Sequence, residues 1–156
     1  MQRVSRISWN FELRSAVADT FDRYIQLPGE NEAGGILLGE IYPDQNLIRV
    51  VEATVPTRAD RATATTWHRD TDSANKHIHR AWRDSDGRVQ YIGEWHTHAQ
   101  RHPRPSGRDR QTMNELVREP GLVTDWLLLA IIGQRSNYFS KWTTASEERI
   151  NFQELS

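Results

Sequence analysis

The run Trp126-Leu-Leu-Leu-Ala-Ile-Ile132 is the most apolar segment of the chain. It is bounded by Asp125 and Gly133 and falls far below the ~20 apolar residues that cross a membrane. A short apolar run with such boundaries predicts a buried strand. Apolar or alternating patterns predict further strands within 32–42 (around Ile36-Leu37-Leu38) and at 47–55, 89–98, 138–144 and 148–154.

Three segments show the periodicity of helices, at 10–26, 72–84 and 106–118. Pro28-Gly29 and Pro120-Gly121 are expected to stop the first and the third. The second is expected to turn four side chains inward: Ala74, Ile78, Ala81 and Trp82. Residues 57–70 are polar and weakly patterned and predict a loop, whose movement over a site stays open. We therefore expect an α/β (α+β) fold, with one mixed β-sheet and three flanking helices.

Composition narrows the function classes. A length of 156 residues fits one domain over 1–156, and a net charge of −1 lacks the basic excess of a nucleic-acid binder. Five of the six Trp residues are expected to pack inside: Trp67, Trp82, Trp95, Trp126 and Trp142. The absence of cysteine excludes disulfides, thiol catalysis and Cys-bound zinc. Residues 1–14 lack the apolar core of a signal peptide, so a cytoplasmic location is expected.

The segment 93–110, GEWHTHAQRHPRPSGRDR, carries the chemistry. Side chains alternate along a strand, so His96 and His98 point the same way and can share a cation, while Trp95 points to the other face. A catalytic zinc takes three protein ligands and a water. Asp109 is the obvious third ligand, because a helix capped by Ser106 places it in the first turn. The loop 99–105 is long enough to fold that helix back onto the strand.

The pattern His-x-His-x7-Ser-x-x-Asp resembles the metal-binding signature of the JAB/MPN metalloproteases, also called JAMM peptidases. The segment Glu32-Ala-Gly-Gly-Ile-Leu-Leu-Gly39 is similar to the family's glutamate-led strand. The resemblance implies an MPN/JAB (cytidine deaminase-like) architecture and one zinc held by His96, His98 and Asp109. It also implies that Glu32 is the general acid/base and Ser106 stabilises the oxyanion during amide or isopeptide hydrolysis.

The resemblance is to the short stand-alone bacterial members of that family. These include the peptidases of CBASS anti-phage operons, which reverse the conjugation of a nucleotidyltransferase by ubiquitin-like E1 and E2 partners. The implied substrate is a protein with a ubiquitin-like or conjugated C-terminus, with no membrane or nucleic-acid partner. The basic residues Arg101, Arg104, Arg108 and Arg110 either guide an acidic or C-terminal segment or form an ordinary solvated loop.

Other interpretations stay open. His96 and His98 can be ordinary strand residues, Ser106 with Asp109 can be a purely structural capping box, and Glu32 can be a solvated carboxylate. A non-catalytic MPN scaffold is the main alternative function. A different zinc hydrolase is less favoured, because no histidine follows Asp109. The second pair, His77 and His79, lies about 200° apart on its predicted helix and is expected at the surface.

Overall fold

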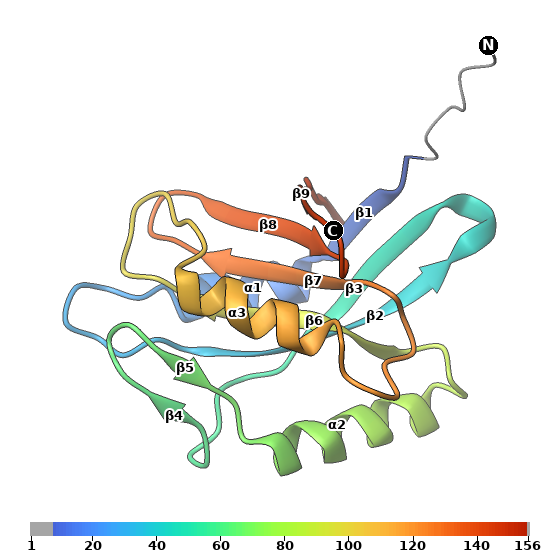
Figure 1. Cartoon of the computed structure of the whole chain (residues 1–156), viewed down its shortest axis with the longest axis horizontal. Helices are drawn as coiled ribbons and strands as arrows, with labels where there is room; N and C mark the ends of the chain where they lie inside the picture. Colours follow the sequence, from blue (N-terminus) through green and yellow to red (C-terminus); the bar gives the residue numbers. More distant parts are fainter. Residues whose placement is uncertain (1–7, 156) are drawn as a thin grey trace.

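The computed structural model describes residues 8–155 (Figure 1). Residues 1–7, the first half of the segment inspected for a signal peptide, lie outside it, as does Ser156. The α-helices are α1 (Ser15–Arg23), α2 (Thr71–Asp84) and α3 (Gly107–Leu116), with a short 3₁₀ helix at Pro43–Gln45. The strands are β1 (Asn10–Arg14), β2 (Gly34–Tyr42), β3 (Leu47–Ala53), β4 (Arg61–Ala62), β5 (Trp67–His68), β6 (Gln90–Thr97), β7 (Leu127–Ile132), β8 (Asn137–Trp142), β9 (Glu147–Arg149) and β10 (Gln153–Leu155).

An eight-stranded mixed sheet runs in the order β10-β1-β3-β2-β6-β7-β8-β9. β1 pairs in parallel with β10 and β3, and β6 pairs in parallel with β7; the other neighbours are antiparallel. β4 and β5 form a separate two-stranded hairpin. The mixed α/β architecture predicted from the sequence is confirmed, with this small second sheet added.

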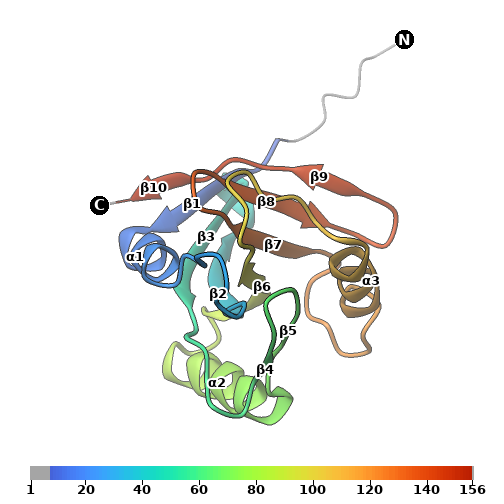
Figure 2. The same ribbon diagram turned by 90° about the vertical axis from the view of Figure 1, so that its left-hand side faces the viewer.

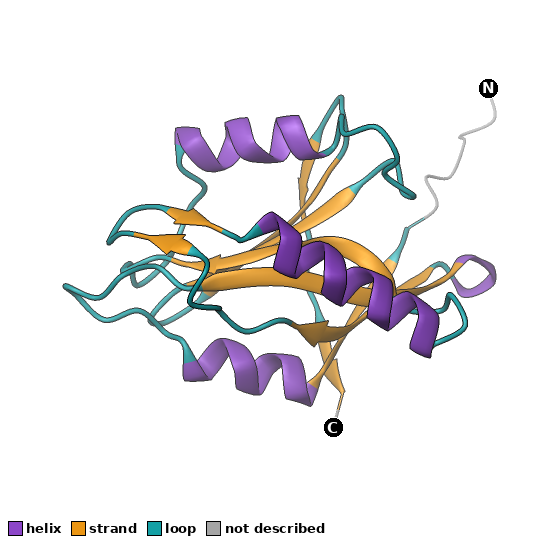
Figure 3. Ribbon diagram, turned by 90° about the horizontal axis from the view of Figure 1, so that it is seen from below, coloured by secondary structure: helices purple, strands orange, loops and turns teal. Residues whose placement is uncertain are grey.

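The helices cover both faces of the sheet (Figures 2 and 3). On one face, Val17 and Phe21 of α1 pack in a cluster with Trp95 of β6 and Leu128 of β7. On the other face, α2 contributes Ala74 to a cluster with β2, and α3 contributes Met113 to a second cluster with β7 and β8. β7 is buried on both faces at every position, as its unbroken apolar sequence requires.

β6 lies in the middle of the sheet and ends beside the start of β2. Gly34 pairs with His96, and the N–H of Thr97 donates to the carbonyl of Ala33 (2.8 Å). A side chain at Gly34 would clash with the Trp95 carbonyl, because its Cβ would lie 2.5 Å from that oxygen. Glycine is therefore needed where the chain enters β2, and this close approach brings the residues before β2 against the last residues of β6.

Several local predictions were wrong. Residues 10–14 form strand β1 instead of the first turn of a helix, since they pair with β3 and β10. The predicted loop 57–70 contains the β4–β5 hairpin, and the predicted strand 148–154 is two short strands. Trp82 is 47% exposed instead of buried, and Trp67 is only partly buried. Among the described residues, no helix has the length and apolarity to span a membrane.

Candidate metal centre

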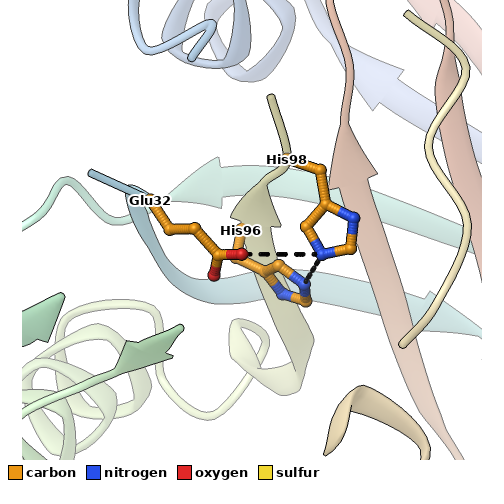
Figure 4. Close-up of side chains that lie close together, drawn as sticks. All are labelled: Glu32, His96 and His98. Carbon is orange, nitrogen blue, oxygen red and sulfur yellow. Dashed lines mark hydrogen bonds and ion pairs between the residues drawn. The ribbon is translucent and has the colours of Figure 1, made fainter. Parts of the chain in front are cut away.

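The end of β6 and the segment before β2 bring three ligand-type side chains together (Figure 4). His96 and His98 point to the same face, and their Nε2 atoms are 3.2 Å apart. Oε1 of Glu32 lies 3.7 Å from Nε2 of His98. One ligand atom from each of the three lies within 4.8 Å of the others, and all three residues are buried. The opposite face of the strand carries Trp95, which is fully buried as predicted.

Asp109 joins this group from the first turn of α3. Its Oδ1 lies 3.1 Å from Nε2 of His96 and its Oδ2 lies 3.2 Å from Nε2 of His98. The predicted capping box is present: Ser106 Oγ accepts from the Asp109 N–H (3.1 Å), and Asp109 Oδ2 accepts from the Ser106 N–H (2.8 Å). The cap thus fixes the carboxylate toward both imidazoles, so the structural and the site interpretations of this motif coexist.

A neighbouring side chain orients the second imidazole. Nδ1 of His98 lies 3.1 Å from Oε1 of Gln100. A carbonyl oxygen can only accept, so this contact selects the tautomer that carries the proton on Nδ1. In the neutral ring with this tautomer, Nε2 of His98 carries the lone pair that binds a metal ion. Such a partner is what a metal-binding histidine ordinarily has on its second nitrogen.

Burial and charge act in opposite directions on the acids and the imidazole of this group. Burial raises the pKa of Glu32, and the neighbouring His96 and His98 offset only part of that rise. Burial alone would also raise the pKa of Asp109, but the contacts with both histidines hold it well below its usual range. Burial alone would lower the pKa of His98, but contacts with Asp109, Gln100 and Glu32 raise it. Asp109 therefore stays ionised while Glu32 takes up a proton more readily.

The residues fit a zinc ion by their chemistry. Two imidazole nitrogens and carboxylate oxygens are ligands that zinc takes in catalytic sites, and here they converge on one small space. Of the predicted site residues, the structure groups Glu32, His96 and His98 within 4.8 Å and brings Asp109 into contact with both imidazoles. Ser106 lies at the start of α3, exposed, with its hydroxyl used as the helix cap. Its role toward an oxyanion stays a prediction.

A groove of about 720 Å³ opens from the site. Glu32, His96 and Asp109 are among its lining residues, together with residues of the β4–β5 hairpin, α2, α3 and the turn after α3. Of the predicted basic cluster, Arg108 lines this groove, whereas Arg110 forms an ion pair with Glu147 on β9. Arg101 and Arg104 are exposed. Elsewhere, His77 pairs with Glu52 (2.7 Å) and His79 is exposed.

Sequence reasoning missed a second polar cluster in the groove. Glu94 Oε1 accepts hydrogen bonds from Arg69 Nε (2.9 Å) and from the Tyr91 hydroxyl (2.6 Å). Glu94 stands two residues before His96 on the same strand, and that spacing was a usable signal. It also missed Gln26, a buried residue that is hydrogen-bonded to nearby Glu30 and to three distant segments, and whose distant contacts give no local signal.

Most of the chain resembles known proteins. Residues 15–145 match the model of a family described as prokaryotic homologs of the JAB domain. The chain belongs to this family. The fold is also similar to the solution structure of protein DSY2949 from Desulfitobacterium hafniense: the TM-score is 0.63 at 16% identity, over 93% of this chain and 92% of that one. At that identity the likeness concerns the fold alone.

Two similar relatives are each named "CD-NTase/cGAS isopeptidase". The one from Pseudomonas aeruginosa (strain BWHPSA011 / Pa011) is 36% identical over 99 residues, 63% of this chain and 61% of that protein. The one from Enterobacter hormaechei subsp. hoffmannii (strain UCI 50) is 35% identical over 89 residues, 57% of this chain and 48% of that protein. The match thus spans about half to three fifths of the length of these relatives.

Proposed function

We propose that this JAB-family chain is a zinc-dependent isopeptidase. Its substrate would be a protein joined through its C-terminus to another by a ubiquitin-like E1/E2 system, and specifically a CD-NTase of bacterial anti-phage defence. The observation that carries the proposal is the contact of His96, His98 and Asp109, with Glu32 beside them, next to a groove. The printed names of the two relatives support the choice of substrate.

The geometry favours different roles for the two acids. Asp109 contacts both imidazoles, at 3.1 and 3.2 Å, and stays ionised, as a metal ligand must. Glu32 approaches His98 at 3.7 Å, and burial raises its pKa. A carboxylate with a raised pKa is suited to take up a proton and release it again. We therefore assign His96, His98 and Asp109 to the metal, and Glu32 to proton transfer.

The reaction would follow from these positions. Zinc, when bound, lowers the pKa of a water molecule and polarises the substrate carbonyl. Glu32 accepts the proton of the attacking water on a carboxylate oxygen and later delivers it to the leaving amine. The Ser106 hydroxyl accepts from the Asp109 N–H and still has its own proton to donate toward negative charge on the carbonyl oxygen. No covalent bond to the enzyme forms.

We also propose that residues 1–156 form one domain and that the protein is located in the cytoplasm.

Metal content and hydrolysis together test this proposal. The probe is a CD-NTase linked through its C-terminal carboxyl to a lysine side chain. We expect wild-type protein to bind zinc in a one-to-one ratio and to release the CD-NTase. The His96→Ala, His98→Ala double variant should lose both properties. Glu32→Gln should keep zinc and lose activity by about 10²- to 10⁴-fold, the usual contribution of a positioned acid or base.

Ser106 needs a variant that separates its two roles. Glycine is tolerated as a helix cap at a cost of only a few tenths of a kcal/mol, so Ser106→Gly removes the hydroxyl and largely keeps α3. We expect a loss of about 10²-fold in kcat with zinc retained. Full activity in this variant would leave Ser106 a structural cap alone. A wild-type protein that takes up no zinc would favour the non-catalytic scaffold.

A further inference from the structure

Gln26 is a buried carboxamide behind the candidate site. It follows α1 and is 1% exposed. Its Nε2 donates to the carbonyl of Glu30 (2.8 Å) and to the carbonyl of Ala64 (2.9 Å), and its Oε1 accepts from the hydroxyl of Thr97 (3.0 Å). Both donors and the acceptor are therefore used. The side chain joins the segment before β2, the turn of the β4–β5 hairpin and the end of β6.

The groups that Gln26 binds include or adjoin those that fix the backbone around Glu32. The N–H of Glu32 donates to the carbonyl of Thr63 (2.7 Å), next to Ala64 in the hairpin turn. The N–H of Ala33 donates to Oγ1 of Thr97 (2.9 Å), and the N–H of Thr97 donates back to the carbonyl of Ala33 (2.8 Å). Gln26 thus binds Thr97, which supports Ala33, and it binds Ala64, the residue after the one that supports Glu32.

Thr97 connects this support to the other half of the site. It lies between His96 and His98 and is fully buried. Side chains alternate along the strand, so the hydroxyl of Thr97 points to the face opposite the two imidazoles. Gln26 consequently approaches the site from behind and touches none of the four acids and imidazoles directly. Any influence it has on the reaction passes through the backbone of residues 32, 33 and 97.

We propose that Gln26 is a positioning residue that holds the Glu32 carboxylate in register with His96 and His98. This role rests on the proposed function of Glu32. Removing a buried carboxamide whose hydrogen bonds are all made leaves several buried groups without partners, and each such group lowers stability. The carbonyls of Glu30 and Ala64 and the hydroxyl of Thr97 would each lose a partner. Loss of Gln26 should therefore loosen the Glu32 segment before it loosens the sheet.

The first test measures amide hydrogen exchange by NMR on Gln26→Glu and Gln26→Ala, without metal or substrate. Glutamate has the same shape but cannot donate to both carbonyls. We expect the amides of Glu32 and Ala33 to exchange at least about tenfold faster, with those of β7 and β8 unchanged. Gln134→Ala is the matched control, because it removes only the bond from Gln134 Nε2 to the carbonyl of Gln26 (3.1 Å). It should leave the Glu32 and Ala33 amides as in the wild type.

Two results would overturn the proposal. Unchanged exchange at Glu32 and Ala33 would show that Gln26 does not hold them, and an equal acceleration in β7 and β8 would show a general loss of stability. If the Gln26 variants do not fold, Thr97→Val breaks the bond to Gln26 from its other end, and the amide of Glu32 is then the readout, because this variant also removes the acceptor of the Ala33 N–H. Thr97→Ser keeps the hydroxyl and should restore slow exchange at Glu32. Fast exchange in Thr97→Ser, equal to that of Thr97→Val, would also contradict the proposal.

Kinetics on the CD-NTase conjugate give a second readout. We expect Gln26→Glu to lower kcat about tenfold or more with KM and zinc content unchanged, because proton transfer depends on the position of Glu32 and substrate binding does not. A rise in KM with kcat preserved would place Gln26 in groove formation instead. If the wild type cleaves no conjugate, the proposed function fails, whereas the exchange experiment still decides whether Gln26 holds the Glu32 segment.

Discussion

β6 carries two buried polar clusters on one face, and they are built differently. At Glu94 the carboxylate is matched with partners of its own: Arg69 Nε at 2.9 Å and the Tyr91 hydroxyl at 2.6 Å. Two residues further along, His96 and His98 share one small space with the carboxylates of Glu32 and Asp109. There the Nε2 atoms of His96 and His98 lie 3.2 Å apart, and the side chains converge on one place instead of forming separate pairs.

The two clusters differ in the partners that each carboxylate has. Burial raises the pKa of Glu94, but Arg69 and Tyr91 oppose that rise with a charge and a hydrogen bond. The side chain of Arg69 is 21% exposed and that of Glu94 is 11% exposed, so water screens this ion pair only weakly. It also fastens the residue after β5 to β6. At the other cluster burial also raises the pKa of Glu32, and its neighbours there are the imidazoles of His96 and His98, which offset that rise only in part.

The largest expected difference between the two clusters is in the free energy of unfolding of variants at Glu94 and at Glu32. Glu94→Gln leaves the guanidinium of Arg69 without its counter-charge, and breaking a buried pair from one side costs about 3 kcal/mol or more. Glu32→Gln replaces a buried carboxylate by a neutral group of the same size, so the metal-free protein should lose less than about 0.5 kcal/mol. Urea unfolding of both variants without metal measures the two free energies.

A double variant controls this comparison. Arg69→Gln combined with Glu94→Gln removes both charges, and the loss should be smaller than the sum of the two single losses. Additive losses would mean that Arg69 and Glu94 stabilise the protein independently. Equal losses in Glu94→Gln and Glu32→Gln would contradict the expected difference between the two clusters.

Zinc should stabilise the folded protein by binding at the cluster that contains His96 and His98, and the cluster at Glu94 should not contribute. A ligand at about 100 times its Kd raises the free energy of unfolding by about 2.7 kcal/mol when it binds the folded state alone. We expect this increment in the wild type and in Glu94→Gln, and its absence in the His96→Ala, His98→Ala variant. Thermal melts with zinc and with a chelator measure it. An increment that survives in the double histidine variant would place the metal elsewhere.

The candidate site was predictable because its signals are local. Alternation on a strand sets His96 beside His98, and a cap three residues before Asp109 sets the start of a helix. Glu32 came from the family resemblance, since it lies 64 positions before His96 and no local spacing links the two. The structure then supplied the contact through the pairing of Gly34 with His96.

The misses have one physical cause. Phe11 and Leu13 belong to β1 because that strand pairs in parallel with β3 and β10, and contacts so far along the chain leave no trace in local periodicity. Arg69 lies in a segment interpreted as a loop, and its partner Glu94 stands 25 residues later. Gln26 bonds to residues up to 108 positions away. Fold class follows from local patterns, but buried polar partners depend on tertiary contacts.

The smallest expected effect concerns a third polar contact, which anchors the helix that carries Asp109. Glu147 on β9 accepts a hydrogen bond from the Tyr138 hydroxyl and pairs with Arg110 of α3. Like Glu94, it is a carboxylate with its own partners. Burial and the bond to Glu147 raise the pKa of Tyr138 to about 12.

The direction in which stability changes with pH follows from the raised pKa of Tyr138. The unfolded chain releases the Tyr138 proton near the ordinary pKa of about 10, whereas the folded protein keeps it up to about 12. The contribution of this group to stability is therefore complete below pH 10 and falls as the pH rises through 12. NMR of ring-labelled tyrosine, assigned with Tyr138→Phe, should show a pKa near 12 that drops in Glu147→Gln. Titration at the ordinary value in the wild type would show that Glu147 does not anchor Tyr138, and zinc binding should be the same in Tyr138→Phe as in the wild type.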